Sequence, residues 1–278
     1  MRPLFNQVSI VGLGLIGGSL GIALRRGRVA RRVIGFTQSE TTLRRAKHKG
    51  AVDDGCTELC PDWLGSSDLV VIATPPLSVV PIARQIMRLT SHRFLLTDVA
   101  STKREIVRRI EKILPSRIRF VGSHPMAGSE RSGIQAADPD LFQGAACILT
   151  PTVCTDRSAV AKVSALWRGV GGRPVVLSPA RHDALVAQIS HVPHLAAAAL
   201  VLSAQPEALE LAAGGFTDAT RIALSDPAIW SEICRTNRVE LKKGLDRFIA
   251  QIERLKRLQG AALFRSLEVA QRKRRKLK

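Results

Sequence analysis

The sequence contains no tyrosine, and aromatic residues make up only 4% of its 278 positions. Because proteins that bind single-stranded nucleic acid stack the bases on aromatic side chains, this scarcity argues against such a partner. Cysteines are also few, at five, an odd number without a regular framework. This usage predicts reduced thiols in a cytoplasmic protein and argues against a disulfide-built secreted domain.

Long hydrophobic runs are lacking as well. The apolar stretch 195–202 is too short to span a bilayer, so we expect no membrane association. Arg2 and Pro3 lead into a short predicted strand rather than a signal peptide. Cys56 and Cys60 lie in a predicted loop without histidine partners at zinc spacing, so we interpret them as structural or incidental and expect no metal.

Acidic residues are outnumbered, with 23 Asp and Glu against 42 Lys and Arg and a formal net charge of +19. A positive surface favours a small anionic substrate and raises the possibility of nucleic-acid binding. Much of the excess lies in Arg265 and the run 272–278, which has no interleaved aromatic residues. We interpret residues 271–278 as a frayed basic tail and expect no nucleic-acid partner.

A glycine-rich motif follows the first predicted strand, at residues 7–11, and precedes a predicted helix at 19–26. Its residues are Gly12, Leu13, Gly14, Leu15, Ile16 and Gly17. In this setting the first glycine makes a tight turn, the second admits a pyrophosphate, and the third lets helix and strand pack closely. The motif predicts dinucleotide binding at the helix N-terminus. The alternative is a glycine-rich turn that binds no ligand.

The second predicted strand, 32–37, lacks the acidic residue that usually binds the adenosine ribose. Thr37 and Gln38 stand at its end, and the first acid is Glu40. Without a carboxylate there, a 2′-phosphate is not repelled, so the cofactor is NAD or NADP with a slight preference for NADP. The alternative is that Glu40 or a backbone group binds the ribose hydroxyls of NAD.

Strands and helices alternate up to about residue 178. Further strands are predicted at 69–73, 94–97, 118–121, 146–149 and 174–177, with helices at 41–49, 77–89 and 159–168. This alternation predicts a doubly wound α/β domain of the Rossmann type over residues 1–179. No convincing strand follows, so residues 180–270 are predicted to form an all-helical domain interrupted at Pro193, Pro206, the glycines 214–215 and Pro227.

The stretch 122–130, GSHPMAGSE, contains a histidine between glycines and beside an acid, after a predicted strand. Open α/β sheets bind ligands at the carboxyl ends of their strands, and Pro125 biases His124 toward an extended backbone. We therefore expect the imidazole to stand out from a loop. The alternative is a turn in which His124 caps a backbone group.

The segment after the strand at 94–97 matches a capping box, with Thr102 as N-cap and Glu105 reaching back. That assignment leaves the hydroxyl of Ser101 free at a strand's carboxyl end, unless Ser101 is itself the cap.

Three clusters in the helical part are candidates for chemistry. His191 and His194 flank a proline; a third zinc ligand at suitable spacing is missing, so the alternative is a pair of core histidines. Asp218 and Arg221 would share a helix face, where the arginine could clamp a carboxylate or merely form a surface pair. Trp230 follows the probable helix start at Pro227 and could be packing alone.

Together these segments resemble one family, the prephenate and arogenate dehydrogenases of tyrosine biosynthesis. The matching motifs, in the family's order, are residues 12–18, 73–75, 98–103, 122–130 with Gly133, 190–194, and 214–223 with Trp230. The resemblance implies an oxidoreductase that oxidatively decarboxylates prephenate to 4-hydroxyphenylpyruvate with hydride transfer to NAD or NADP. It also implies a cofactor site that includes Ala73, Thr74, Pro75 and Asp98.

By the same resemblance, His124 takes the proton of the substrate C4 hydroxyl as general base, and Ser101 orients it. Arg221 holds the ring carboxylate. The remaining implied substrate contacts are Ser123, His191, His194, Glu130 and Asp218. The resemblance further implies that Glu130 and Asp218 form a gate at the pocket mouth.

Trp230 matches a family position that can reach in from a partner subunit, so a homodimer through the helical domain is expected. No regulatory or mutase domain is expected, which would leave a single-function form. Arogenate, or both substrates, is the alternative to prephenate, and tyrosine inhibition stays open. The rivals are another two-domain dehydrogenase, which would use a lysine in its helical domain, and a basic nucleotide-sensing regulatory protein.

Overall fold

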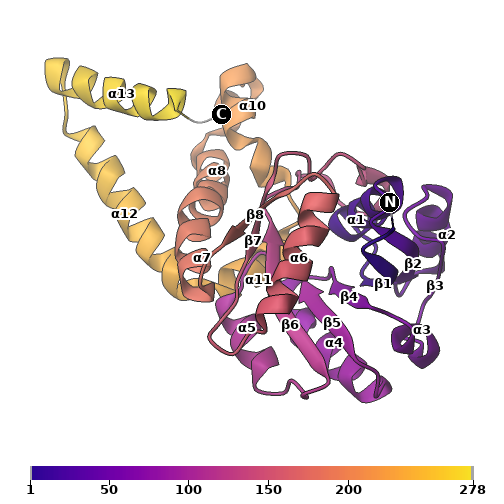
Figure 1. Ribbon diagram of the computed structural model, residues 1–278. Coiled ribbons are helices and arrows are strands. Elements are labelled where there is room, and N and C mark those ends of the chain that lie inside the picture. Colours follow the sequence, from indigo (N-terminus) through magenta and orange to yellow (C-terminus); the bar gives the residue numbers. More distant parts are fainter. Residues whose placement is uncertain (1, 277–278) are drawn as a thin grey trace.

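The chain, in a computed structural model that describes residues 2–276, forms one eight-stranded sheet followed by a helical part (Figure 1). The strand order is β3-β2-β1-β4-β5-β6-β7-β8, and every neighbouring pair is parallel except β6 with β7. The predicted fold class, a doubly wound α/β part followed by a helical part, is confirmed.

The strands are β1 Phe5–Val11, β2 Ala30–Phe36, β3 Asp54–Cys56, β4 Leu69–Ile72, β5 Phe94–Asp98, β6 Ile118–Pro125, β7 Ala146–Leu149 and β8 Arg173–Val176. The helices among them are α1 Leu15–Arg26, α2 Glu40–His48, α3 Pro61–Gly65, α4 Pro76–Leu89, α5 Arg104–Glu111, the 3₁₀ turn η1 Ile134–Ala136, and α6 Arg157–Gly169. The helical part comprises α7 Pro179–Val186, the π turn η2 Ala187–His191, α8 Val192–Ser203, α9 Pro206–Glu210, α10 Gly214–Thr220, the 3₁₀ turn η3 Arg221–Leu224, α11 Pro227–Thr236, α12 Arg238–Lys256 and α13 Gly260–Arg275.

Two strand predictions need correction. Cys56 lies in strand β3, not in a loop. Strand β6 does not end at Val121 but continues to Pro125, where it pairs antiparallel with β7. Proline is tolerated there because it is the last residue of the strand, beyond which the ladder needs no donor from it.

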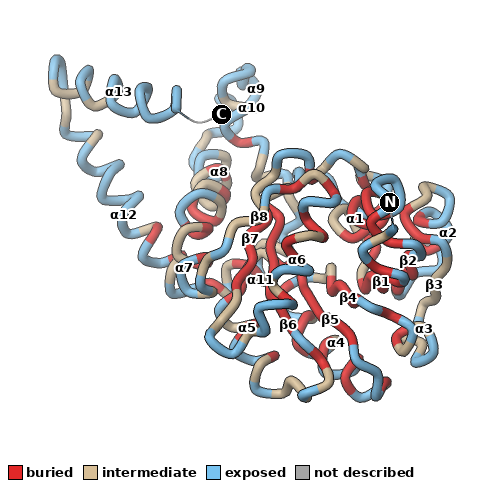
Figure 2. The backbone as a smooth tube through the Cα atoms, in the orientation of Figure 1, coloured by how far each residue is buried: buried red, intermediate tan, exposed pale blue. Residues whose placement is uncertain are grey.

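The core lies on both faces of the sheet, whose strands are buried along most of their length (Figure 2). One apolar cluster packs α1 and α6 against the sheet, and the other packs α4 and α5 against its opposite face. With both faces covered, the continuous apolar runs that predicted the central strands are explained. The carboxyl ends of β1, β4, β5 and β6 are left as the place where loops can form a site.

The helical part begins with one continuous run, Pro179–Ser203, and Pro193 does not interrupt it. Pro193 lies in the first turn of α8, where its missing N–H is not needed, and the π turn η2 joins this helix to α7. By length and composition alone this run of 25 residues could cross a membrane. Because its buried residues His182 and Asp183 bond to the sheet part, we interpret it as a helix packed on the sheet rather than a membrane span.

Helices α12 and α13 extend away from the sheet as an exposed arm (Figures 1 and 2). The basic C-terminal run is not frayed as predicted, because α13 remains helical through Arg275. Residues 277 and 278 lie outside the described residues.

Candidate active site

The glycine loop lies where β1 meets α1, against the carboxyl end of β4. Gly12 has a φ of +99°, and a Cβ there would lie 2.5 Å from the carbonyl oxygen of Ala73. A Cβ on Gly17 would lie 1.9 Å from the carbonyl oxygen of Gly12, whereas one on Gly14 would meet nothing within 4 Å. Two glycines are therefore required by the fold, and the space beside Gly14 is open to a ligand.

The N-terminus of α1 suits an anion. Its N-cap is Gly14, no side chain caps the helix, and its first turn contains no acidic residue. These free N–H groups and the helix dipole can bind a pyrophosphate next to Leu15 and Ile16. The arrangement fits a dinucleotide.

Two other predicted cofactor segments border this loop. Thr74 follows β4 with Ala73 and Pro75, and its buried hydroxyl oxygen has no hydrogen-bond partner among the described residues. An orphaned buried hydroxyl beside the glycine loop indicates a position for a ligand group. At the end of β2, Thr37 is half-buried and Gln38 is exposed, so neither is committed to the core.

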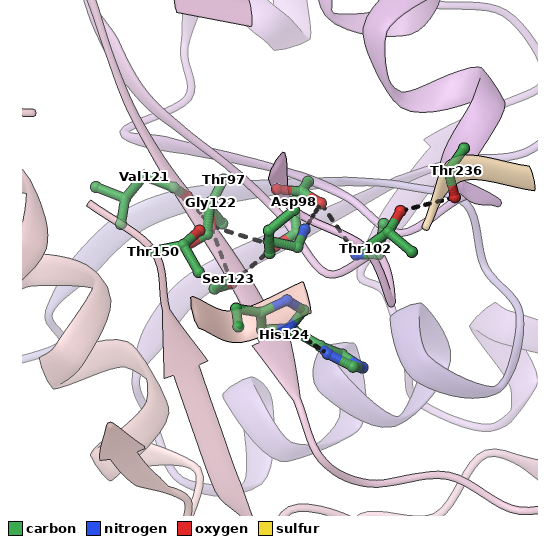
Figure 3. A network of polar contacts seen from close by, with 12 residues as sticks. Thr97, Asp98, Thr102, Val121, Gly122, Ser123, His124, Thr150 and Thr236 are labelled. Atoms are coloured by element: carbon green, nitrogen blue, oxygen red, sulfur yellow. Dashed lines mark hydrogen bonds and ion pairs between the residues drawn. The ribbon is translucent and has the colours of Figure 1, made fainter. Parts of the chain in front are cut away.

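His124 is part of strand β6, not of a protruding loop, and only 8% of its surface is exposed. The extended backbone predicted from Pro125 is present, but the register with β7 turns the imidazole toward the helical part. Its Nδ1 lies 2.8 Å from Nε2 of His182, and Nδ1 of His182 lies 2.7 Å from Oδ1 of Asp183 (Figure 3 shows His124 in this network). Burial first, and then His182, Lys103 and His191, hold the pKa of His124 well below its ordinary 6.5. A neutral His124 can accept a proton through Nε2.

The start of α5 differs from the predicted capping box. Helix α5 begins at Arg104, and Thr102 instead shares a hydrogen bond of 3.0 Å with Thr236 of α11 (Figure 3). Glu105 bonds Arg108 rather than reaching back. The capping role falls to Asp183, a carboxylate from a distant segment. Ser101 is half-buried just before this start, and no hydrogen bond joins it to His124 among the described residues.

Two predicted site residues, Ser123 and Asp98, are fully buried and bond to neighbouring strands and helices. Ser123 is fully buried and donates its hydroxyl to the carbonyl of Asp98 at 2.7 Å. The Asp98 carboxylate is equally buried and forms an ion pair with Lys103. These contacts join β5 to β6 and to the start of α5 next to His124 (Figure 3). Both residues support the site through these contacts, and their roles as ligand contacts stay predictions.

The first of the paired histidines has a defined tautomer. The side-chain nitrogen Nδ2 of Asn237 donates a hydrogen bond of 2.9 Å to the carbonyl oxygen of Asp183, and it lies 3.2 Å from Nδ1 of His191. Since that nitrogen of Asn237 is a donor, Nδ1 of neutral His191 accepts and Nε2 carries the proton. Nε2 is buried and has no partner within residues 2–276, and burial lowers the pKa of His191 to about 4. A neutral donor is thus held ready for an acceptor on a ligand.

The second histidine stacks on a tryptophan of the same chain. The rings of His194 and Trp230 are 3.5 Å apart at an interplanar angle of 6°. Nδ1 of His194 is buried and has no hydrogen-bond partner in the part of the chain that the structure describes. His191 also contacts Trp230, edge to face, with the ring centroids 6.0 Å apart. His191, His194 and Trp230 therefore form one continuous wall of rings.

Arg221, at the start of η3, forms an ion pair with Glu130 from the segment after β6. The side chain of Arg221 is 55% exposed, so the pair lies at the rim of the site. Asp218 is exposed on α10 and does not pair with either residue among the described ones. Glu130 thus pairs with Arg221, and the gate between Glu130 and Asp218 stays a prediction.

The sequence analysis missed His182, Asp183 and Asn237. The available signal was the adjacent His182 and Asp183 shortly after the helix start at Pro179, and nothing in the sequence marked Asn237. Within residues 2–276, no group of three His, Cys, Asp or Glu side chains could hold a metal ion. The candidate site therefore combines the glycine loop, the neutral His124 with its partner His182, the histidines 191 and 194 beside Trp230, and Arg221 at the rim.

The comparisons with known proteins agree on one family. A family model for "Prephenate dehydrogenase, nucleotide-binding domain" matches residues 20–176, and one for "Prephenate dehydrogenase, dimerization domain" matches residues 178–262. Prephenate dehydrogenase of Bacillus subtilis (strain 168) is 36% identical over 263 residues, which cover 92% of this chain and 71% of that protein.

Solved structures are similar over nearly the whole chain. The prephenate dehydrogenase of A. aeolicus in complex with hydroxyphenyl propionate and NAD+ matches with a TM-score of 0.91 at 33% identity, covering 98% of both chains. The arogenate dehydrogenase of Synechocystis matches with a TM-score of 0.81 at 30% identity, covering 98% of this chain and all of that one (100%).

Proposed function

The chain belongs to the prephenate dehydrogenase family, and from this premise we propose that it converts prephenate to 4-hydroxyphenylpyruvate and carbon dioxide. The reaction transfers a hydride from C4 of the substrate to a nicotinamide dinucleotide. The observation that carries the proposal is His124, a buried neutral imidazole backed through Nδ1 at the carboxyl end of the sheet.

His124 is proposed to accept the proton of the C4 hydroxyl through Nε2 as the hydride leaves C4. The C4–O bond becomes a carbonyl, the ring carboxylate departs as carbon dioxide, and the electron pair of its bond makes the ring aromatic. His124 then returns the proton to the phenolate oxygen. His124 thus takes up and returns the same proton. A histidine whose lowered pKa keeps it neutral before the reaction suits this role.

Binding of the substrate is proposed for three groups around His124. Arg221 would exchange its rim contact with Glu130 for the ring carboxylate, to which it can donate two parallel hydrogen bonds. The protonated Nε2 of His191, with His194 beside it, would receive an oxygen of the side chain. Ser101 would orient the C4 hydroxyl next to His124.

The nicotinamide cofactor, when bound, supplies the hydride acceptor. Its pyrophosphate is proposed to bind at Gly12–Gly17 and its remaining parts along Ala73, Thr74 and Pro75. We propose that the chain accepts NAD and NADP with a slight preference for NADP, because β2 ends in Thr37 and Gln38 without an acid.

We also propose a homodimer formed through the helical part. Exposed apolar side chains are concentrated on α8, α12 and α13: Leu200, Leu202, Phe248, Ile249, Ile252, Phe264, Leu267 and Val269. Such a concentration of exposed apolar side chains is typical of a surface that another protein chain covers. A partner's Trp230 at this site stays a prediction, since the chain's own Trp230 already stacks on His194. We further propose two domains, at residues 1–179 and 180–270, and a basic tail at 271–278. Because its cysteines are free, we propose a cytoplasmic location for the protein.

A turnover assay that crosses prephenate and arogenate with NAD and NADP tests the function. We expect reduced nucleotide and carbon dioxide to form in equal amounts with prephenate, and more slowly with arogenate, whose side chain carries an ammonium group. Absence of turnover with either substrate and either nucleotide would refute the proposal. Faster turnover of arogenate would reassign the substrate while keeping the chemistry.

A further inference from the structure

Asp183 joins three parts of the site through one fully buried side chain. It lies in α7 and is 1% exposed. Oδ1 accepts hydrogen bonds from the backbone N–H of Lys103 at 2.8 Å and from His182, while Oδ2 accepts from the N–H of Arg104 at 3.0 Å. Its carbonyl accepts from Asn237 at 2.9 Å. One residue of the helical part therefore contacts the start of α5, the partner of His124, and the amide that fixes His191.

The donors around Asp183 decide where the protons of the histidines lie. Two backbone N–H groups and Nδ1 of His182 lie against its two oxygens, and an ionised carboxylate can only accept. Nδ1 of His182 therefore carries a proton, and Nε2 of neutral His182 has only its lone pair. The atom that meets this lone pair is Nδ1 of His124 at 2.8 Å, so it must be the donor.

The same logic fixes His124. With its proton on Nδ1, neutral His124 has an unprotonated Nε2, which is the form that a general base requires. Had His182 carried its proton on Nε2, His124 would accept at Nδ1 and hold its own proton on Nε2, where it would block proton abstraction. The charge of Asp183 also offsets part of the burial that disfavours the imidazolium of His182.

We propose that Asp183 is a positioning residue for the reaction, which sets the tautomer of His124 through His182 while it caps α5 from the helical part. This inference rests on the proposed function for its kinetic consequence, but the tautomers themselves do not depend on the substrate. It also explains why the carboxylate cap comes from α7: docking of the helical part and activation of the base become one event.

The direct test is nitrogen-15 NMR of histidine-labelled full-length protein without substrate. Protonated and unprotonated ring nitrogens differ widely in chemical shift, and the chain has only six histidines to assign by single substitutions. We expect Nδ1 to be protonated and Nε2 unprotonated in both His124 and His182. A proton on Nε2 of His182 would overturn the proposal, whether or not the protein turns over prephenate.

The kinetic test uses Asp183→Asn, which keeps the size of the side chain but removes its charge and one acceptor oxygen. We expect kcat to fall by at least about 10-fold, with KM for prephenate and the Kd for nucleotide changed by less than about 3-fold. Mixed tautomers of His182 should appear in the spectrum. A lower Tm with unchanged kcat and an unchanged spectrum would reduce Asp183 to a helix cap and overturn the proposal.

Thr236→Val is the matched control. It removes the hydrogen bond between Thr236 of α11 and Thr102, a second contact of the helical part with the start of α5, without touching either histidine. We expect a small loss in Tm but wild-type kcat and wild-type histidine tautomers. If Thr236→Val lowers kcat as much as Asp183→Asn does, anchoring of α5 alone accounts for the effect and the proposal fails.

Discussion

The protonation of His191 couples the substrate wall to the stability of the fold. His191 is 1% exposed, and burial lowers its pKa from 6.5 to about 4, against a smaller opposing effect of Asp183 and further lowering by His182 and His194. Between these pKa values the unfolded chain binds more protons than the folded one. The stability that His191 contributes is therefore present above pH 6.5 and is lost as the pH falls toward 4.

The size of this loss follows from the two pKa values. Acidification to about pH 4.5 should lower the free energy of unfolding by about 2.5 kcal/mol on account of His191 alone. The test is urea unfolding of wild type and His191→Asn at about pH 7.5 and pH 4.5. Since His124, His182 and His194 remain in the variant, the difference between the two pH dependences isolates His191.

We expect the wild type to lose about 2.5 kcal/mol more than the variant over this range. Equal losses would refute the argument that His191 is held neutral with a buried, protonated Nε2. The same result would remove the physical basis for placing an acceptor of the substrate beside it.

Three further predictions concern the nucleotide loop, the arginine and the basic tail. Gly14→Ala should fold with wild-type Tm but bind NAD or NADP at least about 10-fold more weakly by calorimetry, because a Cβ there would enter only the space of the ligand. Gly17→Ala should instead lower Tm, because its Cβ would lie 1.9 Å from the carbonyl oxygen of Gly12. Equal Tm values for the two variants would contradict this reading. Arg221→Ala should raise KM for prephenate by about 10- to 100-fold, as loss of a charged hydrogen bond implies, while Arg247→Ala on the exposed arm should not; an unchanged KM would remove Arg221 from the carboxylate site. Deletion of residues 272–278 should leave kcat unchanged, and loss of turnover together with a salt-sensitive nucleic-acid affinity would favour the regulatory alternative.

The sheet could be predicted from the sequence because most of its strands are continuous apolar runs buried on both faces. Strand β3 escaped prediction because Asp54–Cys56 has only three residues and no apolar pattern. The extension of β6 to Pro125 could not be predicted either, because Ser123, His124 and Pro125 belong to the strand only through their pairing with β7.

The site could be predicted in its local motifs but not in its long-range contacts. The capping box at Thr102 satisfied every local rule, yet a carboxylate 80 residues away supplies the cap. His182 reads as an ordinary residue of a helix start, and only the packing of α7 brings it to His124, 58 residues earlier in the chain. Contacts of this kind depend on tertiary packing, which periodicity and motif spacing do not reveal.

The central claim is that His124 is the general base of an oxidative decarboxylation. Its most direct test is the rate of nucleotide reduction by His124→Asn with saturating prephenate, alongside nucleotide binding by the same protein. We expect kcat to fall by at least about 100-fold while the nucleotide Kd stays within about 3-fold of wild type. Near-normal turnover by this variant would contradict the account.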